Sequence, residues 1–144
     1  MQRRTGYILI AVSAWVLGLC WALSSPVGSS PDDDFHLTSI FCRTGDDNLC
    51  RDIDGAGPGN VVEVPKEVVL SGCFAFDPTT SGECWQPSDD TAKNDHWNYH
   101  GGYPPTFYAV MGVFASEDVA RSVLIMRLVA LTVALASFGL AAWA

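Results

Sequence analysis

The chain has 144 residues, 49% of them hydrophobic, and its sixteen acidic against eight basic side chains give a formal net charge of −8. All the acidic side chains lie in a central segment that is bracketed by two uncharged apolar stretches. Nucleic acid is excluded as a partner, because its binders need a basic surface that neutralises phosphates. The distribution predicts a membrane protein with one large loop outside the cytoplasm.

The first apolar stretch, residues 6–25, contains no charged residue. As a helix it would be about 30 Å long, which matches the hydrocarbon thickness of a bilayer. Two arginines, Arg3 and Arg4, precede it, and short basic flanks stay in the cytoplasm. We therefore expect a cytoplasmic tail over residues 1–5, followed by a transmembrane helix. A cleaved signal peptide is the alternative, although no clear cleavage site of small residues follows Leu23.

Residues 26–102 are predicted to form an acidic loop outside the membrane. Between Ser24 and Asp118 the sixteen acidic residues face only four basic ones, a formal charge of about −12. A helix is predicted over residues 31–43, with Ser30 as its N-cap and Pro31 at its first position. Its first turn would hold three carboxylates, which favour the positive end of a helix dipole. These are Asp32, Asp33 and Asp34.

Four of the five cysteines lie in this loop. An even number in an oxidising compartment predicts two disulfides, and four cysteines allow three pairings. We expect the sequence-local pairs, Cys42 with Cys50 and Cys73 with Cys84, because each closes a short loop that contains turn residues. A zinc site is the alternative, but these spacings are longer than those of zinc knuckles.

The middle of the loop has weaker signals. Residues 45–60 are turn-rich, residues 61–64 read as a short strand, and residues 65–76 as either a helix or a strand. Residues 77–102 are predicted to be irregular. They contain a spacing that would suit a metal site on a helix, although the neighbouring Asn98 and Gly101 favour a loop. That candidate consists of Asp95, His96 and His100.

Residues 103–116 are predicted to form a rigid turn followed by a helix on the membrane surface. Pro104 and Pro105 fix the turn. After them, apolar side chains recur at helical spacing and make one apolar face. These are Phe107, Val110, Met111 and Phe114. Nearby tyrosines supply the aromatic enrichment that is typical of the headgroup region.

The last predicted element is a long helix over residues 117–144, with Ser116 as its cap and its first turns outside the membrane. Its uncharged part, residues 128–144, is the second predicted span, so Arg127 falls near the outer headgroups. Because this span ends without a polar tail, we expect either the front of a longer polytopic protein or a naturally truncated copy. The predicted fold is thus α-helical and membrane-embedded in the cytoplasmic membrane. Two transmembrane helices flank a disulfide-linked extracytoplasmic loop of mixed secondary structure. The chain is expected to be a fragment of a larger helical bundle.

Three motifs suggest a family: residues 31–36 (Pro-Asp-Asp-Asp-Phe-His), residues 103–108 (Tyr-Pro-Pro-Thr-Phe-Tyr) and Arg127-Leu128. Their order resembles the front of the type C membrane glycosyltransferases, which use polyprenyl-phosphate-linked sugars. The chain is also similar to an actinobacterial family of predicted membrane proteins of unknown function, whose members look like such enzymes. The resemblance covers essentially the whole chain but only the first part of a typical member.

On the matching positions, the resemblance implies that Asp32 and Asp33 are catalytic, activating the acceptor, or that they hold a divalent cation together with His36. Arg127 would bind the donor phosphate, because a guanidinium matches phosphate oxygens in a two-pronged way. The donor site would be shaped by Pro104, Pro105 and Tyr108. The aspartates also have a simpler explanation as a favourable helix start.

The chain departs from the family pattern. Many type C enzymes carry a basic residue before the Pro-Pro pair, whereas this chain has Gly102 and Tyr103 there. A later acidic motif and most of the helix bundle are also missing, so we expect this chain alone not to catalyse sugar transfer.

Two function classes remain. The first is part of, or a short homologue of, a cell-envelope glycosyltransferase, with membrane lipids and a polyprenyl-phosphate sugar as partners. A transmembrane bundle or another membrane subunit would complete it. The second is a non-enzymatic, membrane-anchored module that presents its disulfide-bonded loop to a protein partner.

Overall fold

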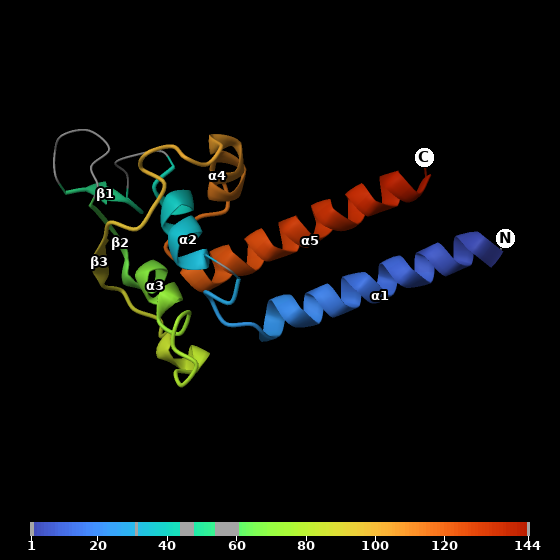
Figure 1. Ribbon diagram of the computed structural model, residues 1–144, viewed down its shortest axis with the longest axis horizontal. Coiled ribbons are helices and arrows are strands. Elements are labelled where there is room, and N and C mark those ends of the chain that lie inside the picture. Colours follow the sequence, from blue (N-terminus) through green and yellow to red (C-terminus); the bar gives the residue numbers. More distant parts are fainter. Residues whose placement is uncertain (1, 31, 44–47, 54–60, 144) are drawn as a thin grey trace. The chain divides into compact units, whose positions relative to one another are not determined.

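The structure is a computed structural model that describes residues 2–30, 32–43, 48–53 and 61–143 (Figure 1). It divides into two compact units. The first, here called the helical pair, consists of residues 1–25 and 124–144. The second, here called the lobe, consists of residues 26–123.

The helical pair contains α1 (Gln2–Ser24) and most of α5 (Val119–Trp143). Both helices are long and apolar enough to cross a membrane, over Thr5–Ser24 and Val119–Ala141. Only 6% and 11% of these windows are buried, whereas a core helix of a soluble protein would be mostly covered. Both predicted apolar spans are therefore present as exposed helices, and the second begins well upstream of residue 128.

The two helices of the pair approach each other closely at Gly18. A Cβ atom added there would lie 2.5 Å from a methyl carbon of Leu131, so α1 and α5 are in contact at this point. Small residues at such contacts let helix backbones pack closely in lipid, where no hydrophobic effect drives helices together. The contact is consistent with two helices that associate inside a bilayer.

The lobe contains a three-stranded antiparallel sheet in the order β1-β2-β3, as Figure 1 shows. The strands are β1 (Arg51–Asp52), β2 (Val62–Pro65) and β3 (Thr91–Asn94). Val62 and Val64 are buried, because alternate side chains of β2 point to the same face of the sheet. The predicted strand over residues 61–64 is β2, shifted by one residue. The prediction that residues 77–102 are irregular is wrong for β3.

Helix α2 (Asp33–Phe41) lies at the centre of the lobe, where Leu37 to Phe41 are all buried. It packs against α3 (Lys66–Val69), η1 (Leu70–Gly72) and α4 (Pro105–Gly112). The segment that could be read as helix or strand, residues 65–76, is therefore largely helical. The core also includes Val68 and Val119, both fully buried.

The start of α2 differs from the prediction. Asp32 is the N-cap and adopts a left-handed conformation, with φ of 59°, which aspartate tolerates better than most residues. Ser30 is not the cap; its backbone N–H donates to Asp33 Oδ2 at 3.1 Å, which ties the turn before the helix. The acidic first turn itself is confirmed for Asp33 and Asp34. Pro31, the predicted first position, lies outside the described residues.

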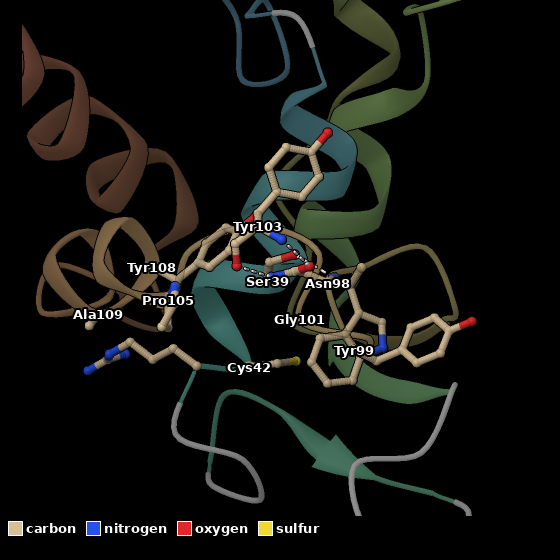
Figure 2. Close-up of a pocket in the computed structure, with 11 residues that line it drawn as sticks. Ser39, Cys42, Asn98, Tyr99, Gly101, Tyr103, Pro105, Tyr108 and Ala109 are labelled. Atoms are coloured by element: carbon tan, nitrogen blue, oxygen red, sulfur yellow. Dashed lines mark hydrogen bonds between the residues drawn. The ribbon is translucent and has the colours of Figure 1, made fainter.

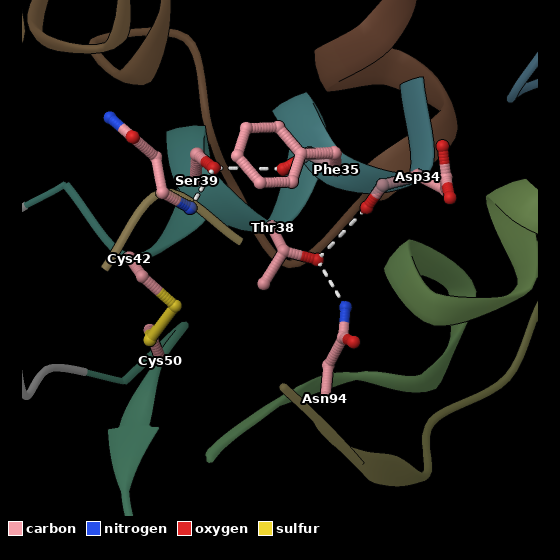
Figure 3. Close-up of a disulfide and its surroundings, with 8 residues drawn as sticks. Asp34, Phe35, Thr38, Ser39, Cys42, Cys50 and Asn94 are labelled. Atoms are coloured by element: carbon pink, nitrogen blue, oxygen red, sulfur yellow. Dashed lines mark hydrogen bonds between the residues drawn. A yellow bond between two sulfur atoms is a disulfide. The ribbon is translucent and has the colours of Figure 1, made fainter. Parts of the chain in front are cut away.

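Two disulfides connect the loops of the lobe. Cys42, at the end of α2, is joined to Cys50, just before β1, and both are buried (Figure 3). Cys73 is joined to Cys84 in η2 (Gly82–Cys84). These are the two sequence-local pairs expected from the sequence. Most of the predicted turn-rich segment, residues 44–47 and 54–60, lies outside the described residues.

The connection from α4 to α5 is held by hydrogen bonds of hydroxyl groups. Ser122 Oγ donates to the Asp118 carbonyl at 2.8 Å and accepts from the Ser116 backbone N–H at 2.9 Å. Asp118 caps α5, because its Oδ1 accepts from the Arg121 backbone N–H at 2.9 Å. The prediction that Ser116 caps this helix is wrong, and α4 ends at Gly112 rather than near residue 116. We call residues 113–118 the elbow.

Candidate binding pocket

The start of α4 follows from its two prolines. Pro104 is the N-cap residue and Pro105 takes the first helical position, where a missing N–H costs no hydrogen bond. One turn later, Tyr108 is buried against α2, and its hydroxyl lies 3.0 Å from His36 Nδ1. The predicted turn and helix are thus confirmed, and they bring Tyr108 to the centre of the lobe.

An aromatic cluster surrounds this hydrogen bond. The His36 ring makes edge contacts with Phe35, Tyr103 and Phe107, at centroid distances of 5.3 to 6.2 Å. Edge-to-face geometry is the favoured arrangement for aromatic rings. Burial raises the pKa of Tyr108, so its phenol stays protonated and can donate a hydrogen bond at neutral pH. Two members of the cluster, Tyr103 and Tyr108, line a pocket.

The pocket has a volume of about 530 Å³, within the range of small-molecule sites. Helices α2 and α4 form its sides, and the segment from Trp97 to Tyr103 closes it (Figure 2). Its lining residues are Ser39, Cys42, Arg43, Trp97, Asn98, Tyr99, Gly101, Tyr103, Pro105, Tyr108 and Ala109.

The closing segment is held in place by Asn98. Its backbone N–H donates to Ser39 Oγ at 2.9 Å, and its side-chain amide makes two hydrogen bonds with the Tyr103 backbone, each of 3.1 Å. Gly101 supplies the left-handed turn between them, with φ of 67°. Sequence reasoning missed both Ser39 and Asn98. The only sequence signal at the segment was the Asn and Gly content that favoured a loop over a helix.

The polar groups of the pocket favour an anionic ligand. Arg43 is exposed and is the only charged residue among the described lining residues; its Cδ and guanidinium atoms lie against Gly112. Among the lining residues that the structure describes, none is a carboxylate. The Trp97 indole N–H is buried and has no hydrogen-bond partner in the described part of the lobe. The wall therefore offers a cation and an unused donor beside three tyrosine rings.

The predicted catalytic aspartates lie elsewhere. Asp33 ties the turn before α2, and Asp32 occupies its left-handed cap. His36, predicted to join them around a cation, is instead paired with Tyr108. Among the described residues, no three side chains of the His, Cys, Asp and Glu types come together as a metal site. A divalent cation held by Asp32, Asp33 and His36 therefore stays a prediction.

The second histidine candidate also has an ordinary explanation. His96 follows β3, and its Nε2 lies 3.5 Å from Asp34 Oδ2, beside a smaller pocket of about 350 Å³. His100 stacks on Tyr99, with ring centroids 3.8 Å apart. These residues are not on a helix, as the nearby Asn98 and Gly101 predicted. The spacing of His96 and His100 therefore does not place the two side chains on one helix face.

Comparison with known proteins identifies a family. The model of the family described as "Predicted membrane protein (DUF2142)" matches residues 15–144. The chain belongs to this family. No curated protein and no solved structure matches the chain significantly.

In this DUF2142 member, the family match covers the second half of α1, the lobe and α5. Arg127, predicted to bind a donor phosphate, lies in the helical pair. Its Nη1 donates to the Ser25 carbonyl at 2.8 Å, and its guanidinium lies 5.2 Å from the Trp21 ring centroid. A cation is favourable beside the carbonyls at a helix C-terminus, so Arg127 stabilises the end of α1.

Proposed function

We propose that this chain is the amino-terminal part of, or a short homologue of, a membrane glycosyltransferase-like protein that uses a polyprenyl-phosphate-linked sugar in cell-envelope assembly. In this proposal the lobe faces the outside of the cytoplasmic membrane and recognises the sugar and phosphate of the donor. The observation that carries the proposal is the pocket in which tyrosine rings, amide and hydroxyl groups and one arginine converge.

The charge distribution and the cysteines support this orientation. Arg3 and Arg4 precede the first apolar helix, and basic flanks stay in the cytoplasm. The acidic residues all follow that helix. Two disulfides within the lobe require an oxidising compartment, which the cytoplasm is not.

The pocket chemistry supports a ligand of mixed character. Tyrosine faces pack against the apolar face of a sugar ring, while Asn98, Ser39 and the Trp97 N–H can pair with its hydroxyl groups. Arg43 supplies a charge-assisted, two-pronged partner for a phosphate. A hydrocarbon chain alone would leave the buried Trp97 N–H unpaired, at a cost.

The described lining residues supply groups that can bind a ligand, which supports recognition as the role of the lobe by itself. This observation also keeps the second candidate in place, in which the lobe is a non-enzymatic, membrane-anchored module. In that case a protein partner would fill the pocket instead of a sugar phosphate.

Binding measurements on the full chain in detergent test the proposal. The probe is a short-chain prenyl-phosphate hexose, titrated by calorimetry, with inorganic phosphate and the free hexose as competitors. We expect Arg43→Gln to weaken binding about tenfold, since it removes one charge-assisted interaction. Lys93→Gln, which removes an exposed cation outside the pocket, is the matched control and should bind like the wild type. No saturable binding to the wild-type chain would refute the sugar-phosphate assignment.

A second experiment tests the predicted catalytic role of Asp33. Asp33→Asn keeps an oxygen that can accept from the Ser30 N–H but removes the negative charge, whereas Asp33→Ala removes both. If Asp33 activates the acceptor, both variants lose sugar transfer in the complete enzyme. If Asp33 only ties the turn before α2, the Asn variant keeps transfer and the Ala variant is merely less stable.

A further inference from the structure

We propose that α4 lies on the lipid surface, with one apolar ridge inserted among the acyl chains next to the headgroups. The ridge consists of Phe107 and Val110 on α4 and of Val113, the C-cap residue of that helix, and we call it the α4 ridge. The inference requires that the chain resides in a membrane, but it does not depend on what the pocket binds.

The exposure pattern of α4 separates two faces. Tyr108 and Gly112, one turn apart, are buried against the lobe. The three ridge side chains are 48%, 50% and 71% exposed, and they follow one another every three residues. An apolar face of this kind, on the side of a helix away from its own core, needs another apolar partner.

The charge distribution favours lipid as that partner. The whole segment from Trp97 to Ser116 contains no Asp, Glu, Lys or Arg, although the lobe is otherwise strongly acidic. An acidic surface is repelled by anionic headgroups, whereas an uncharged apolar surface can enter them. The ridge can thus approach the bilayer without an electrostatic penalty. Tyr103, 52% exposed just before α4, suits the headgroup level.

Continuity with α5 supports the same partner. The elbow joins α4 to the first turn of α5, and Ser116 and Ser122 hold it by hydrogen bonds at 2.8 and 2.9 Å. Val119 and Val123 in that turn are buried in the lobe. The exposed apolar part of α5 begins just beyond them, inside the candidate span that ends at Ala141. Six connecting residues reach no more than about 20 Å, so the end of α4 lies within that reach of the start of the candidate span.

Fluorescence quenching in vesicles tests the inference. The full chain, with its free Cys20 replaced by serine, receives single cysteines at Val110 or Val113 that carry an environment-sensitive dye. It is reconstituted into phosphatidylcholine vesicles that contain lipids with a nitroxide near the headgroup. Controls are Ala109→Cys, on the same helix but lining the pocket, and Lys93→Cys, exposed on β3. Retention of both native disulfides verifies that each variant is folded.

We expect the dye at Val110 and Val113 to be quenched several-fold more strongly than at Ala109 or Lys93. Equal quenching at all four positions would overturn the proposal. Energy transfer between dyes on separate copies, persisting when the protein is diluted in lipid, would assign the ridge to a protein interface and would also overturn it. Neither result would affect binding of a sugar phosphate to the pocket, so the two proposals fail separately.

Discussion

Tyr108 on α4 and His36 on α2 are 72 residues apart in sequence, yet a single hydrogen bond of 3.0 Å joins them at the centre of the lobe. This hydrogen bond connects α2, which begins with the acidic residues, to α4, which begins with the Pro-Pro pair. Two of the three sequence motifs that suggested a family therefore meet in space, although the aspartates of the first motif are not among the described lining residues of the pocket.

This hydrogen bond contributes to the stability of the lobe. Tyr108→Phe keeps the ring but removes the hydroxyl, and we expect it to lower the free energy of unfolding by about 1 kcal/mol. Tyr103→Phe is the matched control, because the Tyr103 hydroxyl has no hydrogen bond to another residue in the described ranges. Urea unfolding of the full chain in detergent, followed by tryptophan fluorescence, measures both. Equal midpoints for the two variants would contradict a structural role of the pair.

Two glycines with positive φ allow the cost of backbone strain to be measured apart from the cost of steric overlap. Gly28 has φ of 86°, and a Cβ there would overlap the Ser71 carbonyl oxygen. Gly101 has φ of 67° but nothing within 4 Å of an added Cβ. We expect Gly101→Ala to destabilise the lobe by about 1 kcal/mol, through strain alone. Gly28→Ala should cost about 3 kcal/mol or more, since backbone must move. Similar unfolding midpoints for the two variants would show that the Gly28 turn relaxes freely.

Glu67 makes stability depend on pH. It is buried, and burial raises the pKa of its carboxyl; the nearby Asp118 and Asp89 raise it further, against hydrogen bonds from the Ser88 and Val119 backbones. The folded lobe therefore holds this proton more tightly than the unfolded chain does. The resulting stabilisation is fully present below the ordinary pKa of glutamate and is lost as the pH rises through the raised pKa.

We accordingly expect acidification from neutral pH to stabilise the wild type more than Glu67→Gln, which keeps an oxygen for the Ser88 N–H but cannot titrate. Urea midpoints of both proteins across a pH series measure the effect. Because the other carboxylates titrate in both proteins, the difference between the two proteins isolates the contribution of Glu67 to the pH dependence of stability. A difference between the two that stays constant with pH would rule out Glu67 as the source.

The two disulfides differ in burial, so they should differ in their resistance to reduction. Cys42 and Cys50 are 4% and 3% exposed, whereas Cys73 and Cys84 are partly exposed. With increasing reductant and a trapping alkylator, we expect mass spectrometry to find Cys73 and Cys84 modified first. Loss of either cross-link should lower the free energy of unfolding by about 2 to 3 kcal/mol. Simultaneous modification of all four cysteines would show that burial does not protect the first pair.

Much of the fold could be predicted from the sequence, because its signals are local. Uncharged runs predicted the two long helices, the Pro-Pro pair predicted the start of α4, and short spacings predicted the cysteine pairs. The strand β3 was missed because Thr91 to Asn94 show no apolar alternation. It is a short edge strand with an outward lysine, and its partner β2, not its own sequence, makes it a strand.

The pocket could not be predicted for a related reason. Ser39 and Asn98 are 59 residues apart, and neither belongs to a motif that a single sequence displays. Arg43 lies just after α2, where it had no distinguishing pattern. Sequence periodicity reports neighbours within one helix or strand, whereas this pocket is made by side chains from three separate segments. The error at Ser116 has a similar cause, since Asp118 and Ser116 are equally good caps by residue type.

Cys42 belongs both to the wall of the pocket and to a covalent bond with Cys50. The end of α2 beside Arg43 is thereby fastened to the segment that precedes β1. Under the proposed function, this corner of the binding wall would be fastened only after oxidation, so a newly made chain would complete its recognition site outside the cytoplasm.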